Sequence, residues 1–131
     1  MGEQRIVGVG LHVADLERSV DFYTDVVGMK ELARYEFDGL TEVMVGYPTG
    51  DGAPSLILVD RADNPGPHDV GNGFDRVMLM VDDVDAVCDR LRAFGCTVIT
   101  EPAPMDQFPV KLAMAQDPDG YRLELLESRE S

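Results

Sequence analysis

Short apolar runs punctuated by glycine, proline and aspartate set the layout of this 131-residue chain. The stretch "VGVGLHV" at 7–13 alternates aliphatic side chains with glycine and histidine, and a period of two is typical of a β-strand. An amphipathic helix is predicted to begin after Asp15 and to end at Gly28. Its apolar side carries, at helical spacing, Leu16, Val20, Tyr23 and Val27.

The same pattern returns in the second half of the chain. "LHVADLERSVDFYTDVVGMKEL" can be laid over "LMVDDVDAVCDRLRAFGCTVIT" without a gap, and Asp83 then matches Asp15. Both aspartates are placed to accept hydrogen bonds from the first turn of a helix, and Gly95 provides the second stop. The chain is therefore interpreted as two copies of one unit.

Three strand-like segments follow each predicted helix, separated by turn-forming sequences such as "PTGDGAP" at 48–54 and "DPDG" at 117–120. Each copy thus has the order βαβββ, and the expected fold class is α+β with curved mixed sheets. The strands are expected at 29–37, 41–47 and 55–60, and again at 96–100, 109–116 and 121–127. One domain is expected over 1–131, with a first module at about 5–60, a linker at 61–73 and a second module at about 74–127.

Charge and cysteine content exclude several classes of partner. Eleven basic residues against 25 acidic ones give a formal charge of −14, which repels nucleic acid and anionic membrane surfaces. No apolar run approaches the roughly 20 residues that cross a bilayer, and the start "MGEQRIVGVG" lacks the features of a secretion signal. Cys88 and Cys96 have neither metal-site spacing nor a disulfide framework. Two free thiols favour a cytoplasmic protein.

Two motifs carry a family resemblance. Together with the βαβββ repeat, "VADLERSVDFYTDVVGMK" and "DPDGYRLELLE" resemble the glyoxalase/bleomycin-resistance/dioxygenase group, the vicinal oxygen chelate superfamily. Within it they look most like the lactoylglutathione lyases, and the resemblance covers nearly all of 6–127. It implies two curved sheets around a cavity and a homodimer. It says less about activity, because one fold hosts many chemistries.

The resemblance also implies where metal-using members hold their ion. Each half supplies two ligands from its first and last strands, and the matching positions here are Gly8, Ile57, Arg76 and Glu124. Only Glu124 keeps a ligand atom, whereas a catalytic divalent metal needs about three protein donors. We therefore predict no metal and no other cofactor. A non-standard metal site using His12, His68 and Glu124 is kept as an alternative.

Strand alternation predicts which side chains face the cavity. Gly8, Gly10 and His12 share one face, and the two glycines are expected to leave room there. Methionines on this side give an adaptable apolar wall, or are ordinary core residues. His12 is expected to contact substrate, since its position resembles that of an arginine that grips a substrate carboxylate in lactoylglutathione lyases, or to be structural. His68 is expected to be exposed. The ligand-binding residues predicted are His12, Met44, Ile57, Arg76, Met78, Met80, Met114 and Glu124.

These positions support three hypotheses about function. The first is metal-free binding of a small, partly apolar molecule at Arg76 and Glu124, which are expected to meet as an ion pair. The second is a metal-independent isomerase, epimerase or lyase acting beside a carbonyl, with Glu124 as the base and Arg76 stabilising the oxyanion. The third, which the missing ligands disfavour, is a metal-dependent lactoylglutathione lyase.

Overall fold

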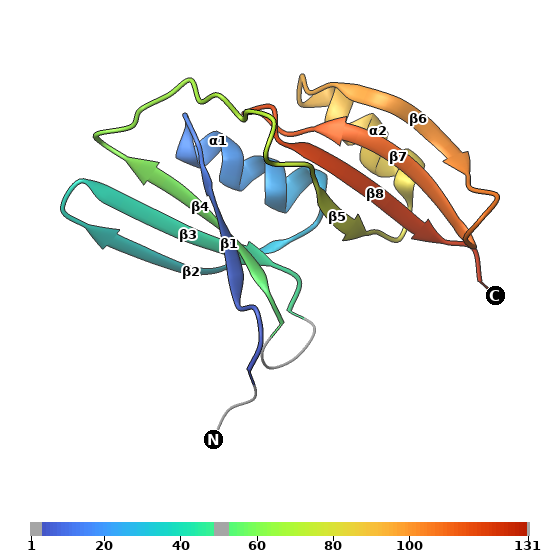
Figure 1. Cartoon of the computed structure of the whole chain (residues 1–131), viewed down its shortest axis with the longest axis horizontal. Coiled ribbons are helices and arrows are strands. Elements are labelled where there is room, and N and C mark those ends of the chain that lie inside the picture. Colours follow the sequence, from blue (N-terminus) through green and yellow to red (C-terminus); the bar gives the residue numbers. More distant parts are fainter. Residues whose placement is uncertain (1–3, 49–52, 131) are drawn as a thin grey trace. The chain divides into compact units, whose positions relative to one another are not determined.

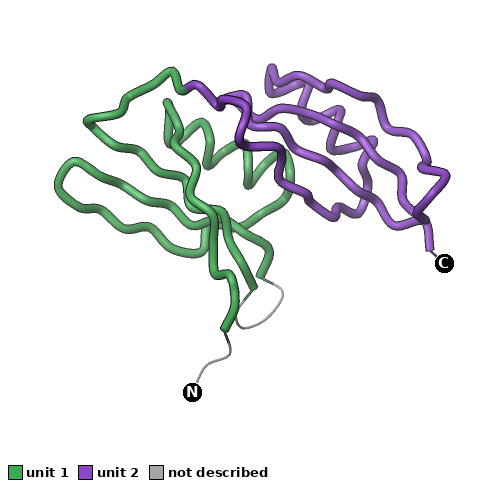
Figure 2. The backbone as a smooth tube through the Cα atoms, in the orientation of Figure 1, with its two compact units in different colours: residues 1–68 green, residues 69–131 purple. Residues whose placement is uncertain are grey.

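Each half of the chain forms a four-stranded mixed sheet with a helix packed against one face (Figure 1). The computed structural model describes residues 4–48 and 53–130. The chain divides into two compact units, 1–68 and 69–131, and the division falls inside the segment 61–73 (Figure 2). No helix among the described residues is long and apolar enough to cross a membrane. The α+β fold class expected from the sequence is confirmed.

The first unit has the strand order β1-β4-β3-β2, in which β1 and β4 are parallel and the other neighbours antiparallel. The helix α1 contacts β4 and covers the face that carries Leu11, Val43 and Leu58. The elements are β1 (Gly8–His12), α1 (Leu16–Asp21), η1 (Phe22–Val26), β2 (Lys30–Phe37), β3 (Leu40–Gly46) and β4 (Ser55–Arg61).

The second unit repeats this topology with the strand order β5-β8-β7-β6. Its helix α2 contacts β6, β7 and β8 and buries Val84, Val87, Cys88 and Leu91 against them. Burial raises the pKa of the Cys88 thiol, which keeps it protonated. The elements are β5 (Val77–Met80), α2 (Val84–Ala93), β6 (Val98–Pro104), β7 (Val110–Gln116) and β8 (Arg122–Ser128).

The predicted helix boundaries are confirmed by their hydrogen bonds. Asp15 Oδ1 accepts from the Arg18 amide at 3.1 Å, and Asp83 Oδ1 accepts from the Ala86 amide at 3.1 Å. Gly28 and Gly95 follow the helices with φ of 80° and 89°, a conformation that favours glycine. The capping residues named from sequence therefore have the roles expected of them.

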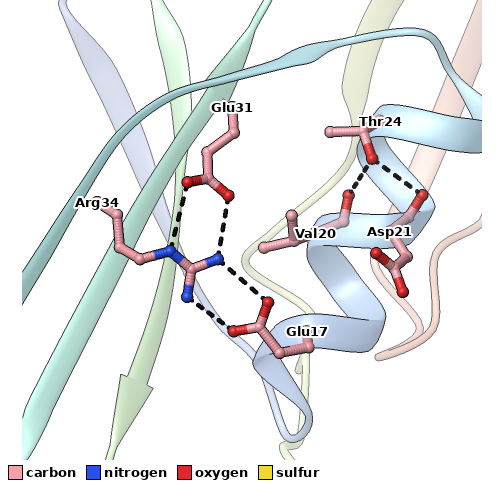
Figure 3. A network of polar contacts seen from close by, with 6 residues as sticks. All are labelled: Glu17, Val20, Asp21, Thr24, Glu31 and Arg34. Atoms are coloured by element: carbon pink, nitrogen blue, oxygen red, sulfur yellow. Dashed lines mark hydrogen bonds and ion pairs between the residues drawn. The ribbon is translucent and has the colours of Figure 1, made fainter.

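The first helix differs from the prediction because its second half is a π-helix rather than an α-helix. Thr24 Oγ1 donates to the Val20 carbonyl at 2.9 Å, competing for the acceptor that an α-helical Thr24 amide would use (Figure 3). The wider turn lets the adjacent Phe22 and Tyr23 both be fully buried. Their rings are in edge-to-face contact, with the ring centroids 5.0 Å apart. The burial predicted for Tyr23 is confirmed, but the α-helical period predicted for residues 22–26 is wrong, because this part is a π-helix.

Strand positions agree with the prediction except at β6, which runs to Pro104 instead of ending near residue 100. The strand continues through the prolines of "EPAP" because β6 is an edge strand and tolerates missing amide donors. Register shifts on either side of Thr100 adjust its pairing with β7. The "DPDG" turn is confirmed, since buried Asp117 accepts from the amides of Asp119 and Tyr121. Most of the predicted turn at 48–54 lies outside the described residues.

Candidate functional site

Arg76 and Glu124 meet on the face of the second sheet that points away from α2. Arg76 directly precedes β5, and Glu124 lies in the middle of β8, beside Met78 in the parallel register of these strands. Arg76 Nε donates to Glu124 Oε1 at 2.8 Å. The guanidinium side chain is 36% exposed and the carboxylate side chain 12% exposed, so the pair is only partly buried. The contact expected from the sequence is present.

Arg76 also contacts two nearer neighbours. Its Nη1 donates to Asp75 Oδ2, and its Nη2 lies 3.9 Å from the sulfur of Met78. The hydrogen bond to Asp75 and the charge of Glu124 raise the pKa of Arg76 above its already high value, so the group stays cationic. The carboxylates of Asp75 and Glu124 thus hold the Arg76 guanidinium in place just before β5 begins.

Methionine side chains flank the Arg76–Glu124 pair. Met78 on β5 and Met114 on β7 both lie in register with Glu124, one on each side of it. Met78 and Met80 are 56% and 58% exposed, whereas Met114 is half-buried. The two β5 methionines therefore do not fill the core of this unit. Their exposed thioethers form an apolar, deformable surface next to the ion pair.

The corresponding region of the first sheet is filled. A Cβ added at Gly8 would lie 3.0 Å from Ile57 Cδ1 and 3.0 Å from the Ser55 carbonyl oxygen. The expected space beside Gly8 is therefore absent, because the Ile57 side chain occupies it. Gly10 keeps some room, since its added Cβ would meet Val59 only at 3.7 Å. Met44 is half-buried beside Ile57, its register partner.

These residues do not fit the metal that the family resemblance implies. The first sheet offers neither a side-chain donor atom nor space at Gly8 and Ile57, and the second presents a guanidinium that the carboxylates of Glu124 and Asp75 both hold. A cation is repelled by Arg76, and two carboxylates fall short of the roughly three donors that a catalytic site uses. We derive no metal-dependent step from this arrangement.

His12 lies at the end of β1, beside His68 of the segment 61–73 that follows β4. Their ring centroids are 5.5 Å apart, and His68 Nε2 contacts the Asn64 carbonyl oxygen at 2.9 Å. The prediction that His68 is exposed is wrong, because the ring is half-buried and its Nδ1 atom fully buried. The long-range packing of the loop on β1 caused this, and no local pattern shows it. The alternative metal site that adds Glu124 to these histidines stays a prediction.

Sequence reasoning missed a polar network between α1 and β2. Arg34 Nη1 donates to Glu17 Oε2 at 2.7 Å, and Arg34 Nη2 donates to Glu31 Oε1 at 3.0 Å (Figure 3). The hydrogen bond from Arg34 lowers the pKa of the Glu17 carboxyl, and the two glutamates raise the pKa of Arg34. The network borders a cleft of about 470 Å³ whose other polar lining residues are Asp15, Glu36, Thr41 and Asp60. This cleft differs from the apolar cavity expected near Arg76.

One group of three potential metal-ligating side chains occurs among the described residues, at the start of α2. Carboxylate oxygens of Asp83, Asp85 and Glu127 lie within 4.8 Å of one another. Each has a structural partner: Asp83 and Glu127 accept from the amides of Ala86 and Val84, and Asp85 pairs with Lys111. These contacts explain the cluster as helix capping and charge pairing.

Comparison with known proteins gives a consistent family assignment. The model of the Glyoxalase/Bleomycin resistance protein/Dioxygenase superfamily matches residues 5–125. A probable lactoylglutathione lyase from Synechocystis is 33% identical over 120 residues, covering 90% of this chain and 91% of the relative. A lactoylglutathione lyase from Neisseria meningitidis serogroup A is 34% identical over 127 residues, covering 95% and 91%.

Solved structures agree with this assignment. Glyoxalase I from Zea mays superimposes with a TM-score of 0.83 at 27% identity, and the alignment covers 97% of this chain and 46% of the maize protein. This chain thus spans about half the length of the maize enzyme. TnmS3, an antibiotic binding protein from Streptomyces sp. CB03234, superimposes with a TM-score of 0.72 at 30% identity over 98% of both chains.

Proposed function

The chain belongs to the glyoxalase/bleomycin resistance/dioxygenase superfamily, and from that membership we propose that it binds a small, partly apolar molecule without a metal ion. The proposed site is the open face of the second sheet around Arg76 and Glu124. The proposal rests on one observation: a guanidinium donates to the carboxylate that the resemblance assigns to metal binding. The name of TnmS3 as an antibiotic binding protein supports binding as a function of this fold.

The site offers both hydrogen-bonding chemistry and an apolar surface to such a ligand. Among the described residues, Glu124 Oε2 has no hydrogen-bond partner and is free to accept one from a ligand. The Arg76 side chain stays 36% exposed despite its contacts with Asp75 and Glu124. Met78 and Met80 supply an adaptable surface for the rest of the molecule, because thioether side chains follow varied shapes.

A second candidate function is metal-independent isomerisation or lyase chemistry next to a carbonyl. The names of the lactoylglutathione lyase relatives support it, and Glu124 is the base that it requires. In this reading Arg76 stabilises the oxyanion that forms when the base removes a proton. The hydrogen bond between Arg76 and Glu124 opposes this second function, because it occupies one oxygen of the carboxylate until substrate displaces the contact.

Metal content and the Arg76→Met variant test the proposal. We expect purified protein to contain no stoichiometric zinc, nickel, iron or manganese by elemental analysis, and a chelator to leave its melting temperature unchanged. Any small molecule that co-purifies, identified by mass spectrometry, should be absent from Arg76→Met. About one metal per chain, together with a fall in melting temperature on chelation, would contradict metal-free binding.

The matched control is Arg92→Met, which breaks an exposed ion pair with Glu101 in the same unit. It should retain the ligand and the melting temperature. If both variants lose the ligand equally, the loss reflects general instability and the role of Arg76 is contradicted. Turnover of a panel of small carbonyl compounds by the natural protein in the presence of chelator would favour the enzymatic function over binding alone.

We further propose a cytoplasmic homodimer. Cys88 and Cys96 are free thiols, which supports a reducing compartment. Val7 directly precedes the edge strand β1 and is 58% exposed, and Val9 on this strand is 47% exposed. A second copy of the chain could cover these apolar side chains.

A further inference from the structure

Arg122 is a cation on the open face of the second sheet. It begins β8, two residues before Glu124, so both side chains lie on the same face of the strand. Its side chain is exposed and, among the described residues, makes no hydrogen bond or ion pair. By contrast, Arg34, Arg76 and Arg92 all hold carboxylates. An unpaired guanidinium beside a partly buried ion pair is available for a ligand.

The register of the sheet places Arg122 level with Arg76. The parallel pairing of β5 and β8 begins at Val77 and Leu123, so the preceding residues of the two strands lie side by side. Arg122 is also in register with Gln116 on β7. Arg76, Arg122 and Gln116 thus form a row of polar residues at the end of the sheet where β8 begins.

The side chains on this face become less polar along β8, from Arg122 towards Leu126. Glu124 lies in the next row between Met78 and Met114, and the row after that is wholly apolar: Met80, Leu126 and Leu112. Successive rows are about 6.6 Å apart, so the face changes from cationic to apolar over about 13 Å. An extended small molecule with one polar end matches that gradient.

We propose, building on the proposed function, that the ligand is an amphipathic monocarboxylic acid. Its carboxylate binds Arg122, and its apolar part lies over Met80 and Leu126. A carboxylate accepts two parallel hydrogen bonds from a guanidinium, which fixes the orientation of the head group. Arg76 contacts both Asp75 and Glu124, whereas Arg122 is left to pair with a single negative charge from a ligand. Polyanions are further disfavoured by the net charge of −14.

The test uses 4-phenylbutanoate and its neutral counterpart 4-phenylbutanamide, which share one apolar body. Protein labelled with ¹³C on the methionine methyl groups reports binding through the signals of Met78, Met80 and Met114. We expect both compounds to shift these signals, with the acid binding about tenfold to a hundredfold more tightly, the usual range for a charge-assisted contact. Arg122→Gln should abolish the difference by weakening the acid only.

Arg129→Gln is the matched control, since it removes an exposed cation of the same type beyond the end of β8. It should keep the preference for the acid. Equal binding of acid and amide to the natural protein would overturn the carboxylate assignment and leave small-molecule binding at this face intact. Absence of methionine shifts with either compound would overturn the assignment as well. The proposed function is judged separately, by the co-purifying ligand and the Arg76→Met variant.

Discussion

Two glycines on one strand face differ in what surrounds them. Gly8 lies against Ile57 and the Ser55 carbonyl, whereas Gly10 has ordinary space towards Val59. We predict that Gly8→Ala lowers the free energy of unfolding by about 1–3 kcal/mol, the usual cost of overpacking, because the Ser55 backbone is held by its strand pairing and cannot retreat. Urea denaturation followed by circular dichroism measures the change.

Gly10→Ala is the matched control on the same strand and face. Its methyl group has room, and alanine restricts the unfolded chain more than glycine does, so we expect a change between zero and about 1 kcal/mol of stabilisation. Equal destabilisation by the two substitutions would show that Ile57 does not fill the space at Gly8. Position 8 would then have room for a metal-ligating side chain.

At the scale of an element, the start of α2 depends on two carboxylates. Asp83 accepts from the Ala86 amide, and Glu127 from β8 accepts from the Val84 amide at 2.8 Å. We predict that Asp83→Ala lowers the free energy of unfolding by about 0.5–1 kcal/mol, the lower part of the range for a lost helix cap. The loss is moderated because the nearby carboxylates of Asp85 and Glu127 then repel less. Thermal denaturation checks it.

Asp82→Ala provides the comparison, since it removes the same charge one residue earlier without removing a cap. Its effect should stay within about 0.5 kcal/mol, as for most surface substitutions. A larger loss in Asp82→Ala than in Asp83→Ala would mean that general charge, rather than the hydrogen bond to Ala86, governs this helix end.

At the scale of the whole molecule, the exposed valines of the first unit lead to a prediction about assembly. We expect light scattering at micromolar concentration to report twice the 14.4 kDa chain mass. Val9→Glu should weaken the dimer because it places a charge on an apolar surface that a second copy would cover. The same substitution at the exposed Phe108 should not. A species of 14.4 kDa alone would contradict the homodimer.

Local patterns were sufficient for the helix caps, the turn at 117–120 and most strand positions. The caps at Asp15 and Asp83 and the stops at Gly28 and Gly95 depend on neighbouring residues, so the chain itself specifies them. The Arg76–Glu124 contact was predicted from the family resemblance, which places both residues where side chains converge on one ion in metal-using members. The alternation of side chains along the strands predicted that Met78 and Met114 share this face.

Contacts between distant segments decided the rest, since their geometry depends on how elements pack. The Ile57 side chain fills the space at Gly8, His68 packs beside His12, and Arg34 reaches Glu17 on the helix. The π-helical turn is a further departure from the helical period, and it buries Phe22 and Tyr23 together. The repeat, the fold class and the lack of donor side chains at Gly8, Ile57 and Arg76 can all be read from the residues. Which of those positions is filled and which stays exposed follows from packing, because it depends on the volume and reach of side chains far apart in the chain.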